Sequence, residues 1–295
     1  MDIFSRSWSL FKSSWRVVRG EPSLLWFPIV SAIAVVAASL LLLGVLGGFM
    51  IYSQDAQNAL SAAAASEDDS SLLSILGIVV LFIYYLIVGS IATYFATAMT
   101  GAALRRLDGH DTSFFDGIRI ANRHVGTIVG YSAIAATVGV AISLLRRQRN
   151  GIAGAFLAEL GEMAWGIVTF LAVPVIANQE TSAIGAIKES SRLLRTTWGE
   201  QLVGSGGIGA VFALMGVGVL VLTGALAALL SSIGDLALVV IGLGMIALVV
   251  VVVLNSTLGG IYKAAVYRYA AQGDVAPQFD AALIEHAFRL EGAPA

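Results

Sequence analysis

The chain has 295 residues, of which 58% are hydrophobic and only 12% are charged. Soluble globular domains carry about 25% charged residues, so this composition excludes an ordinary soluble domain and makes lipid the main solvent of the folded chain. The chain contains no cysteine, which also excludes disulfides, thiolate metal sites and cysteine nucleophiles.

Six apolar stretches contain no Asp, Glu, Lys or Arg. They cover residues 22–54, 70–104, 124–145, 163–179, 201–234 and 236–262. About 20 apolar residues suffice to cross a bilayer as a helix, and a helix satisfies its backbone polar groups within the hydrocarbon. We therefore predict an all-α, polytopic transmembrane helix bundle with six spans, in which residues 1–295 form a single integral membrane domain.

Residues 1–20 precede the first span and are predicted to form an amphipathic helix in the membrane interface. Aromatic and aliphatic side chains recur at helical spacing from Phe4 to Val18, and the cations turn to the opposite face. Glu21-Pro22 then ends the helix, and hairpin 1 occupies residues 22–104. The first span is too long for a signal peptide and is expected to remain as an anchor. Candidate lipid-interface residues here are Arg6, Trp8, Lys12, Trp15, Arg16 and Arg19.

Residues 113–179 are predicted to contain a second interfacial helix followed by hairpin 2. Glu159 and Glu162 stand at i, i+3 on the entry to the fourth span and share a helix face, with nearby arginines as expected partners. Pro174 lies within that span, where a proline kinks a helix. Asn178 follows at the end of the span.

A third interfacial helix and hairpin 3 are predicted within residues 182–271. When the nine residues from Ser190 are aligned with the nine from Ser7, a Ser, a Leu, a cation, two small hydroxyl residues and a Trp line up. This weak repeat suggests three units of interfacial helix plus hairpin; coincidence is the alternative. In span 6, Asn255 belongs to the most polar cluster. Candidate lipid-interface residues here are Lys188, Arg192, Arg195 and Trp198. A last amphipathic helix is predicted over residues 277–291.

The cations are distributed very unequally between the two sides of the predicted bundle. With a cytoplasmic N-terminus, fourteen of the seventeen Lys and Arg residues lie inside, as the positive-inside rule requires. We expect a prokaryotic plasma membrane protein with both termini cytoplasmic. The exceptions, Arg146, Arg147 and Arg149, lie between the two shortest spans. Full crossing of these spans is favoured, and re-entrance without crossing is the alternative.

Motifs for catalysis or cofactor binding are lacking. Residues 204–209 satisfy G-x-G-x-x-G, but no strand precedes them, so we reject a dinucleotide site. Asp108, His110 and Asp111 fit a solvated turn better than a metal site. We expect no enzyme activity, no cofactor and no nucleic-acid partner.

Two functional hypotheses stay open at this point. The favoured one is a non-enzymatic protein that organises lipid, including anionic lipid, or a membrane-protein partner or second copy through its basic interfacial helices. The alternative is a transporter or channel for an ion or small solute near spans 4 and 6. Its candidate pathway residues are Glu159, Glu162, Pro174, Asn178 and Asn255.

Two sequence stretches carry a resemblance to a known family. One is W-G-I-V-T-F-L-A-V-P-V-I-A-N-Q-E from Trp165, and the other is A-I-K-E-S-S-R-L-L-R-T-T-W-G-E-Q-L-V-G from Ala186. Together with the opening S-W-S-L-F-K-S-S-W-R-V-V-R, they resemble an uncharacterised family of prokaryotic six-span membrane proteins, the domain of unknown function 6159. The resemblance implies the polytopic fold and no activity. A weaker similarity to the membrane domains of some glycerophosphodiesterases implies no such activity either, because we expect no soluble phosphodiesterase domain.

Overall fold

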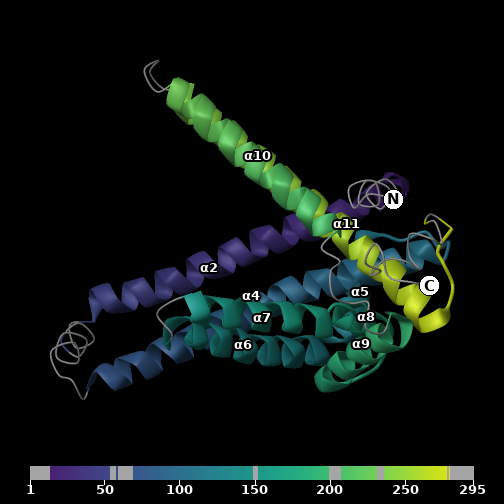
Figure 1. The fold of residues 1–295 in the computed structure, drawn as a ribbon, viewed down its shortest axis with the longest axis horizontal. Coiled ribbons are helices and arrows are strands. Elements are labelled where there is room, and N and C mark those ends of the chain that lie inside the picture. The colour runs from purple at the N-terminus through teal and green to yellow at the C-terminus, as the bar shows by residue number, and fades with distance from the viewer. Residues whose placement is uncertain are drawn as a thin grey trace.

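The computed structural model of the chain contains helices and, in the residues that it describes, no strands (Figure 1). The described residues are 14–53, 58, 69–148, 152–198, 207–230, 236–277 and 279. The long helices are α2 (Trp26–Tyr52), α4 (Asp69–Leu107), α6 (Val125–Gln148), α7 (Ile152–Val168), α10 (Gly207–Leu229) and α11 (Leu236–Gln272). The short ones are η1 (Pro22–Leu25), α5 (Phe114–Arg123), α8 (Ala172–Asn178) and α9 (Ala183–Trp198). The all-α prediction is confirmed.

Five helices of the described part are long and apolar enough to cross a membrane. These segments are Pro22–Phe49, Ile75–Leu107, Val125–Arg146, Gly154–Asn178 and Leu236–Gln272. Helix α10 adds the shorter apolar segment Met215–Leu229. The structure is therefore consistent with six spans, and spans 3 and 4 each have the length that a full crossing needs.

Span 4 begins earlier than its charge-free run predicts. Helix α7 starts at Ile152, so it already contains Glu159 and Glu162, whereas the charge-free run begins only at residue 163. Glutamate is a good helix former. A charged side chain therefore limits how much of a helix can lie in the hydrocarbon, but it does not interrupt the backbone hydrogen bonds of the helix. The first residue of a charge-free run therefore need not be the first residue of the helix.

The same span is interrupted just before Pro174. Helix α7 ends at Val168 and α8 begins at Ala172, with tight hydrogen-bonded turns between them, in which the N–H of Ala172 donates to the carbonyl of Thr169 at 3.0 Å. Pro174 falls in the first turn of α8, where an N–H would have no partner within the helix. The kink predicted from Pro174 is therefore present as a break between two helices.

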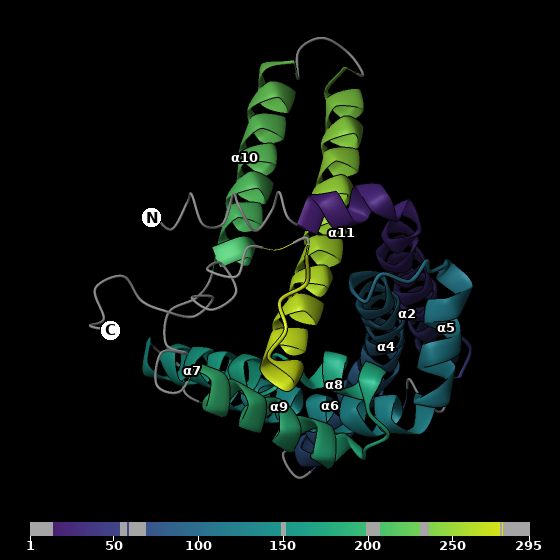
Figure 2. The ribbon, with the colours of Figure 1, turned by 90° about the vertical axis from the view of Figure 1, so that its right-hand side faces the viewer.

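The long helices form two groups. Helices α2, α4, α6 and α7 run side by side in Figure 1, with α4 packed against α2 and α6. The hairpin of α10 and α11 diverges from them and stands apart in Figure 2. Helices α5, α8 and α9 gather at one end of the first group, where the C-terminal half of α11 also lies (Figure 1). We call this end the packed end and the opposite one the open end.

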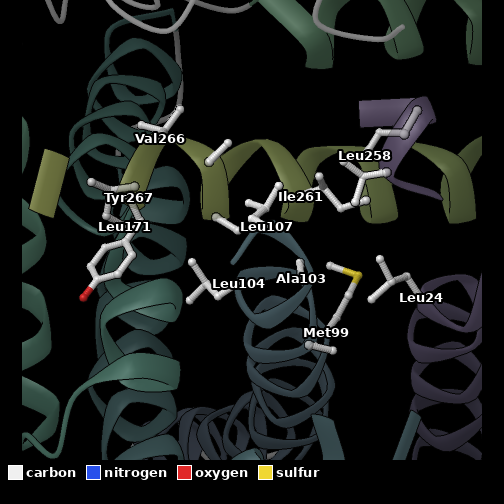
Figure 3. Close-up of a cluster of buried hydrophobic side chains, with 14 of the residues drawn as sticks. Leu24, Met99, Ala103, Leu104, Leu107, Leu171, Leu258, Ile261, Val266 and Tyr267 are labelled. Atoms are coloured by element: carbon white, nitrogen blue, oxygen red, sulfur yellow. The ribbon is translucent and has the colours of Figure 1, made fainter. Parts of the chain in front are cut away.

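The hydrophobic core lies at the packed end, where α11 crosses the end of α4 (Figure 3). Leu258, Ile261 and Tyr267 of α11 are buried there against side chains of η1, α4 and α8. Toward the open end the apolar side chains are exposed, for example Ile33 at 64% and Leu238 at 67%. Such surfaces require lipid or another apolar cover. Core residues drawn in Figure 3 include Leu24, Met99, Ala103, Leu104, Leu107, Leu171 and Val266.

Candidate functional site

Helix α9 presents two chemically different faces. Ala186, Ser190, Leu193 and Leu194 are buried and follow one helical stripe, because α9 packs against α6, α7, α8 and α11. The cations at i, i+4 and i+7 are exposed on another face, and they are Lys188, Arg192 and Arg195. The apolar stripe therefore fixes the helix in place and turns its charge outward.

These cations line an open groove between α9 and the end of α7. The groove has a volume of about 490 Å³. Val168 of α7 and Ile187 of α9 supply apolar walls, and hydroxyl and cationic side chains supply the rest. The complete lining is Val168, Ile187, Lys188, Ser191, Arg192, Arg195 and Thr196. A groove with this lining suits an anion that carries an apolar part.

One of the three cations already has a partner within the helix. Arg192 donates from Nε to Oε2 of Glu189 at 2.8 Å and from Nη2 to Oε1 at 2.6 Å. The hydrogen bond from Arg192 lowers the pKa of Glu189, and the hydrogen bond to Glu189 raises the pKa of Arg192, so both stay charged. Lys188 and Arg195 have no ion-pair partner in the part of the chain that the structure describes.

The lipid-interface candidates of the N-terminal segment are only partly described. Arg16 and Arg19 are exposed, and the guanidinium of Arg19 lies 6.0 Å from the ring centre of Trp15. The opposite face of this turn packs inward, because Val18 is buried. Arg6, Trp8 and Lys12 lie outside the described residues, as does the side chain of Trp198 and most of the predicted helix over residues 277–291.

Helix α5 lies at the same end with its own cap. Ser113 and Asp116 form a reciprocal capping box, in which Asp116 Oδ2 accepts from Ser113 Oγ at 2.7 Å and from Ser113 N at 3.1 Å. These hydrogen bonds hold the pKa of Asp116 below its ordinary value. Arg119 and Asp116 approach to 3.4 Å in the same i, i+3 relation as Arg192 and Glu189.

The five candidate pathway residues do not come together. Glu162 has an arginine partner, as expected, since Oε1 lies 2.6 Å from Nη2 of Arg146, and Glu159 is exposed on the same helix. Pro174 is buried, and Asn178 donates to the hydroxyl of Tyr267 at 3.1 Å. Asn255 is half-buried on α11. Within the described residues, no hydrogen bond or ion pair joins two of these five, and the groove on α9 contains none of them.

Three polar residues that were not candidate site residues make contacts between helices at the packed end, and they are Ser190, Tyr267 and Lys263. The Oγ of Ser190 accepts from the N–H of Leu171 at 3.0 Å, at the break in span 4. The hydroxyl of Tyr267 accepts from Gln179 as well as from Asn178, and Lys263 Nζ lies 5.4 Å from the ring centre of Phe170. The apolar stripe of α9 indicates that Ser190 is buried, but nothing in the sequence indicates which groups these three residues contact.

The carboxylates of the turn after α4 are occupied by arginines. Arg268 contacts Asp108 at 2.9 Å and Asp274 at 2.6 Å, and Arg106 contacts Asp111 at 2.7 Å. No group of three or more His, Asp or Glu side chains suited to a metal ion occurs among the residues described. This turn therefore joins the ends of α4 and α11.

Long apolar helices and a core of buried side chains at one end define the chain as a multi-pass α-helical membrane protein. The sequence profile of the family of unknown function DUF6159 matches residues 75–277, and the chain belongs to this family. No curated protein matches the chain.

Proposed function

We propose that the protein is a non-enzymatic membrane protein that organises anionic lipid at the cytoplasmic leaflet of a prokaryotic plasma membrane. The observation that carries this proposal is the exposed face of α9, where Lys188, Arg192 and Arg195 line one groove while the opposite stripe is buried. On this proposal α9 is an interfacial helix, and the segment of residues 1–20 is a second one.

The charge distribution supports a cytoplasmic position for the packed end. Cations accumulate on the cytoplasmic side of membrane proteins, and the helix ends at the packed end carry Arg105, Arg106, Arg123 and Arg195. The cytoplasmic leaflet also has a negative surface potential, which attracts such cations. Charge and lipid therefore match on the same side.

The strength of this attraction is sufficient to bias the lipid composition around the protein. Each Lys or Arg near an anionic leaflet contributes on the order of 1 kcal/mol. The three cations of α9 lie within two turns of one helix and are exposed, so their contributions act on the same small area of the leaflet. Part of the contribution of Arg192 is offset by Glu189.

Transport, the alternative, gains no comparable support. Glu162, within α7, is paired with Arg146, while Asn178 is bound to Tyr267 beyond the break in span 4. A pathway needs such groups to converge on one cavity near the middle of the membrane. Polar residues that are individually paired and separated along the helices favour a structural role.

The test is lipid selectivity of the full-length chain in vesicles of phosphatidylcholine and phosphatidylglycerol. Spin-labelled versions of both lipids report the fraction immobilised at the protein surface. We expect a larger immobilised fraction for phosphatidylglycerol, and we expect about 1 M salt to abolish the difference because it shortens the Debye length to about 3 Å. Equal immobilisation of the two lipids at low salt would rule out the proposal.

A further inference from the structure

We infer that the groove between α7 and α9 is a discrete site for one anionic phospholipid, whose phosphate binds Lys188, Arg195 and, after exchange from Glu189, Arg192. This inference deepens the proposed function and rests on it. It adds a defined stoichiometry, a set of binding residues and an intramolecular competitor to a general attraction between charges.

The positions of the cations fit a single phosphate group. Residues three and four apart on a helix are neighbours on its surface, so Arg192 and Arg195 flank one another and Lys188 lies one turn earlier. Ser191 contributes a hydroxyl to the same groove. The hydroxyl of Thr196 already donates to the carbonyl oxygens of Arg192 and Leu193, at 2.9 and 3.2 Å. Ser191 is therefore the hydroxyl donor for the ligand.

The apolar walls identify the source of the phosphate as a lipid. Val168 and Ile187 face the groove beside the cations, and a free phosphate ion has no apolar part that would contact them. A volume of about 490 Å³ also exceeds what a lone phosphate fills and falls in the range of small-molecule sites. The glycerol and first acyl carbons of a phospholipid match these walls, and its head group matches the cations.

Glu189 makes the site adjustable. Its two carboxylate oxygens hold Nε and Nη2 of Arg192, the same fork of donors that binds a phosphate in a bidentate manner. A lipid phosphate therefore competes with Glu189 for Arg192. The side chains of Arg192 and Glu189 are 64% and 23% exposed, so the guanidinium can turn toward the groove without unpacking α9.

Native mass spectrometry of the full-length chain, titrated with phosphatidylglycerol, tests the site. We expect one tightly retained lipid in the wild type, and in Lys188→Gln and Arg195→Gln an affinity lower by about fivefold for each lost charge. Glu189→Gln should bind more tightly than the wild type, because it releases Arg192. A gain in affinity cannot result from misfolding.

Two matched variants separate the groove from general charge. Arg119→Gln removes an arginine of α5 that is 69% exposed and pairs with Asp116 as Arg192 pairs with Glu189. Glu180→Gln removes an exposed carboxylate between α8 and α9 that lies outside the groove, and it changes the net charge as Glu189→Gln does. Both should bind as the wild type does. An equal loss in Arg119→Gln and Arg195→Gln, or an equal gain in Glu180→Gln and Glu189→Gln, would overturn the site.

The identity of the ligand is tested in the same titration. Inorganic phosphate at the concentration of the lipid should not displace it; displacement would show a site for soluble phosphate and contradict a lipid site. Suppose that phosphatidylglycerol is selectively immobilised in vesicles, but the groove variants retain the lipid in native mass spectrometry as well as the wild type does. The discrete site then fails and the proposed function survives. If no selectivity exists in vesicles, both fail.

Discussion

Ser190 satisfies a backbone group at the break in span 4. A helix that stops inside a membrane leaves backbone groups without intrahelical partners, and these groups must be satisfied by protein because lipid offers no hydrogen bonds. The N–H of Leu171 meets this requirement through the hydroxyl of Ser190 on α9. Helix α9, which is not part of span 4, therefore supplies the acceptor for a backbone N–H of that span.

Ser190→Ala should lower the free energy of unfolding. The substitution leaves the buried N–H of Leu171 without its acceptor, which costs about 1–3 kcal/mol. Thermal unfolding of the purified protein in detergent measures the effect, and Ser191→Ala is the matched control because Ser191 is the adjacent serine on the groove side of the helix. Equal melting temperatures for the two variants would contradict the role assigned to Ser190.

Individual residues were predictable from the sequence where their chemistry is local. Pro174 predicts a break because its ring and missing N–H act on its own helix, and the break is present. The acceptor roles of Ser190 and Tyr267 were not predictable, because their partners lie 19 and 88 to 89 positions away in the chain. The groove was missed for the same reason, since Val168 and α9 meet only in the fold.

At the scale of elements, α5 is attached to the bundle through a glycine. A Cβ at Gly117 would lie 2.5 Å from the carbonyl oxygen of Ala98 and 2.5 Å from the ring of Phe27. The ring of Phe27 also stacks on Phe114, with centroids 4.6 Å apart. Ala98 belongs to α4 and Phe27 to α2, so the first turn of α5 approaches both helices closely only because Gly117 has no side chain.

Gly117→Ala should destabilise this contact by about 1–3 kcal/mol, the usual cost of overpacking. The control is Gly126→Ala in α6, where a Cβ would meet nothing within 4 Å. That substitution should leave the melting temperature unchanged or raise it slightly, because alanine is the better helix former. If both alanine variants unfold at the wild-type temperature, the close approach at Gly117 does not hold α5.

The cap of α5 predicts a pH dependence. The pKa of Asp116 is lowered in the folded state, mainly by the hydrogen bond from the Ser113 hydroxyl, so its contribution to stability is present above the ordinary aspartate value of about 4 and is lost as the pH falls through the folded pKa. Asp116→Asn should therefore melt below the wild type at neutral pH, and the difference should shrink in acid. A constant difference between about pH 7 and pH 3 would contradict this linkage.

The elements themselves were largely predictable. Apolar runs indicate where helices lie because only helices satisfy their backbone within lipid, and the order of long and short helices follows from them. The start of α7 was not predictable, because Glu159 and Glu162 interrupt the apolar run without interrupting the helix. The units of the internal repeat remain a prediction.

At the scale of the whole molecule, the direction of the spans decides whether the packed end is cytoplasmic. Impermeant maleimide labelling tests it, because the chain has no native cysteine. In intact cells we expect Ser53→Cys and Gln148→Cys to react. We expect His110→Cys and Gln272→Cys to react only after permeabilisation.

Each other labelling pattern excludes a specific arrangement. Protection at position 148 together with reaction at position 53 would show that spans 3 and 4 re-enter without crossing. Reaction at positions 110 and 272 in intact cells would place the packed end outside and remove the basis for binding the cytoplasmic leaflet. The divergence of α10 and α11 from the other spans (Figure 2), in contrast, could not be predicted, since α10 and the first half of α11 are apolar on nearly all sides.

The confinement of the core to one end also bears on how the protein tolerates membranes of different thickness. The open-end halves of α2, α4 and α11 present exposed apolar side chains such as Leu41, Val79 and Leu243, so little protein packing there opposes a change of tilt. Helices respond to hydrophobic mismatch by tilting at a cost of fractions of a kcal/mol per ångström. One leaflet therefore holds a rigid base, and the spans adjust their reach through the other leaflet as the bilayer thins or thickens, without disturbing the groove on α9.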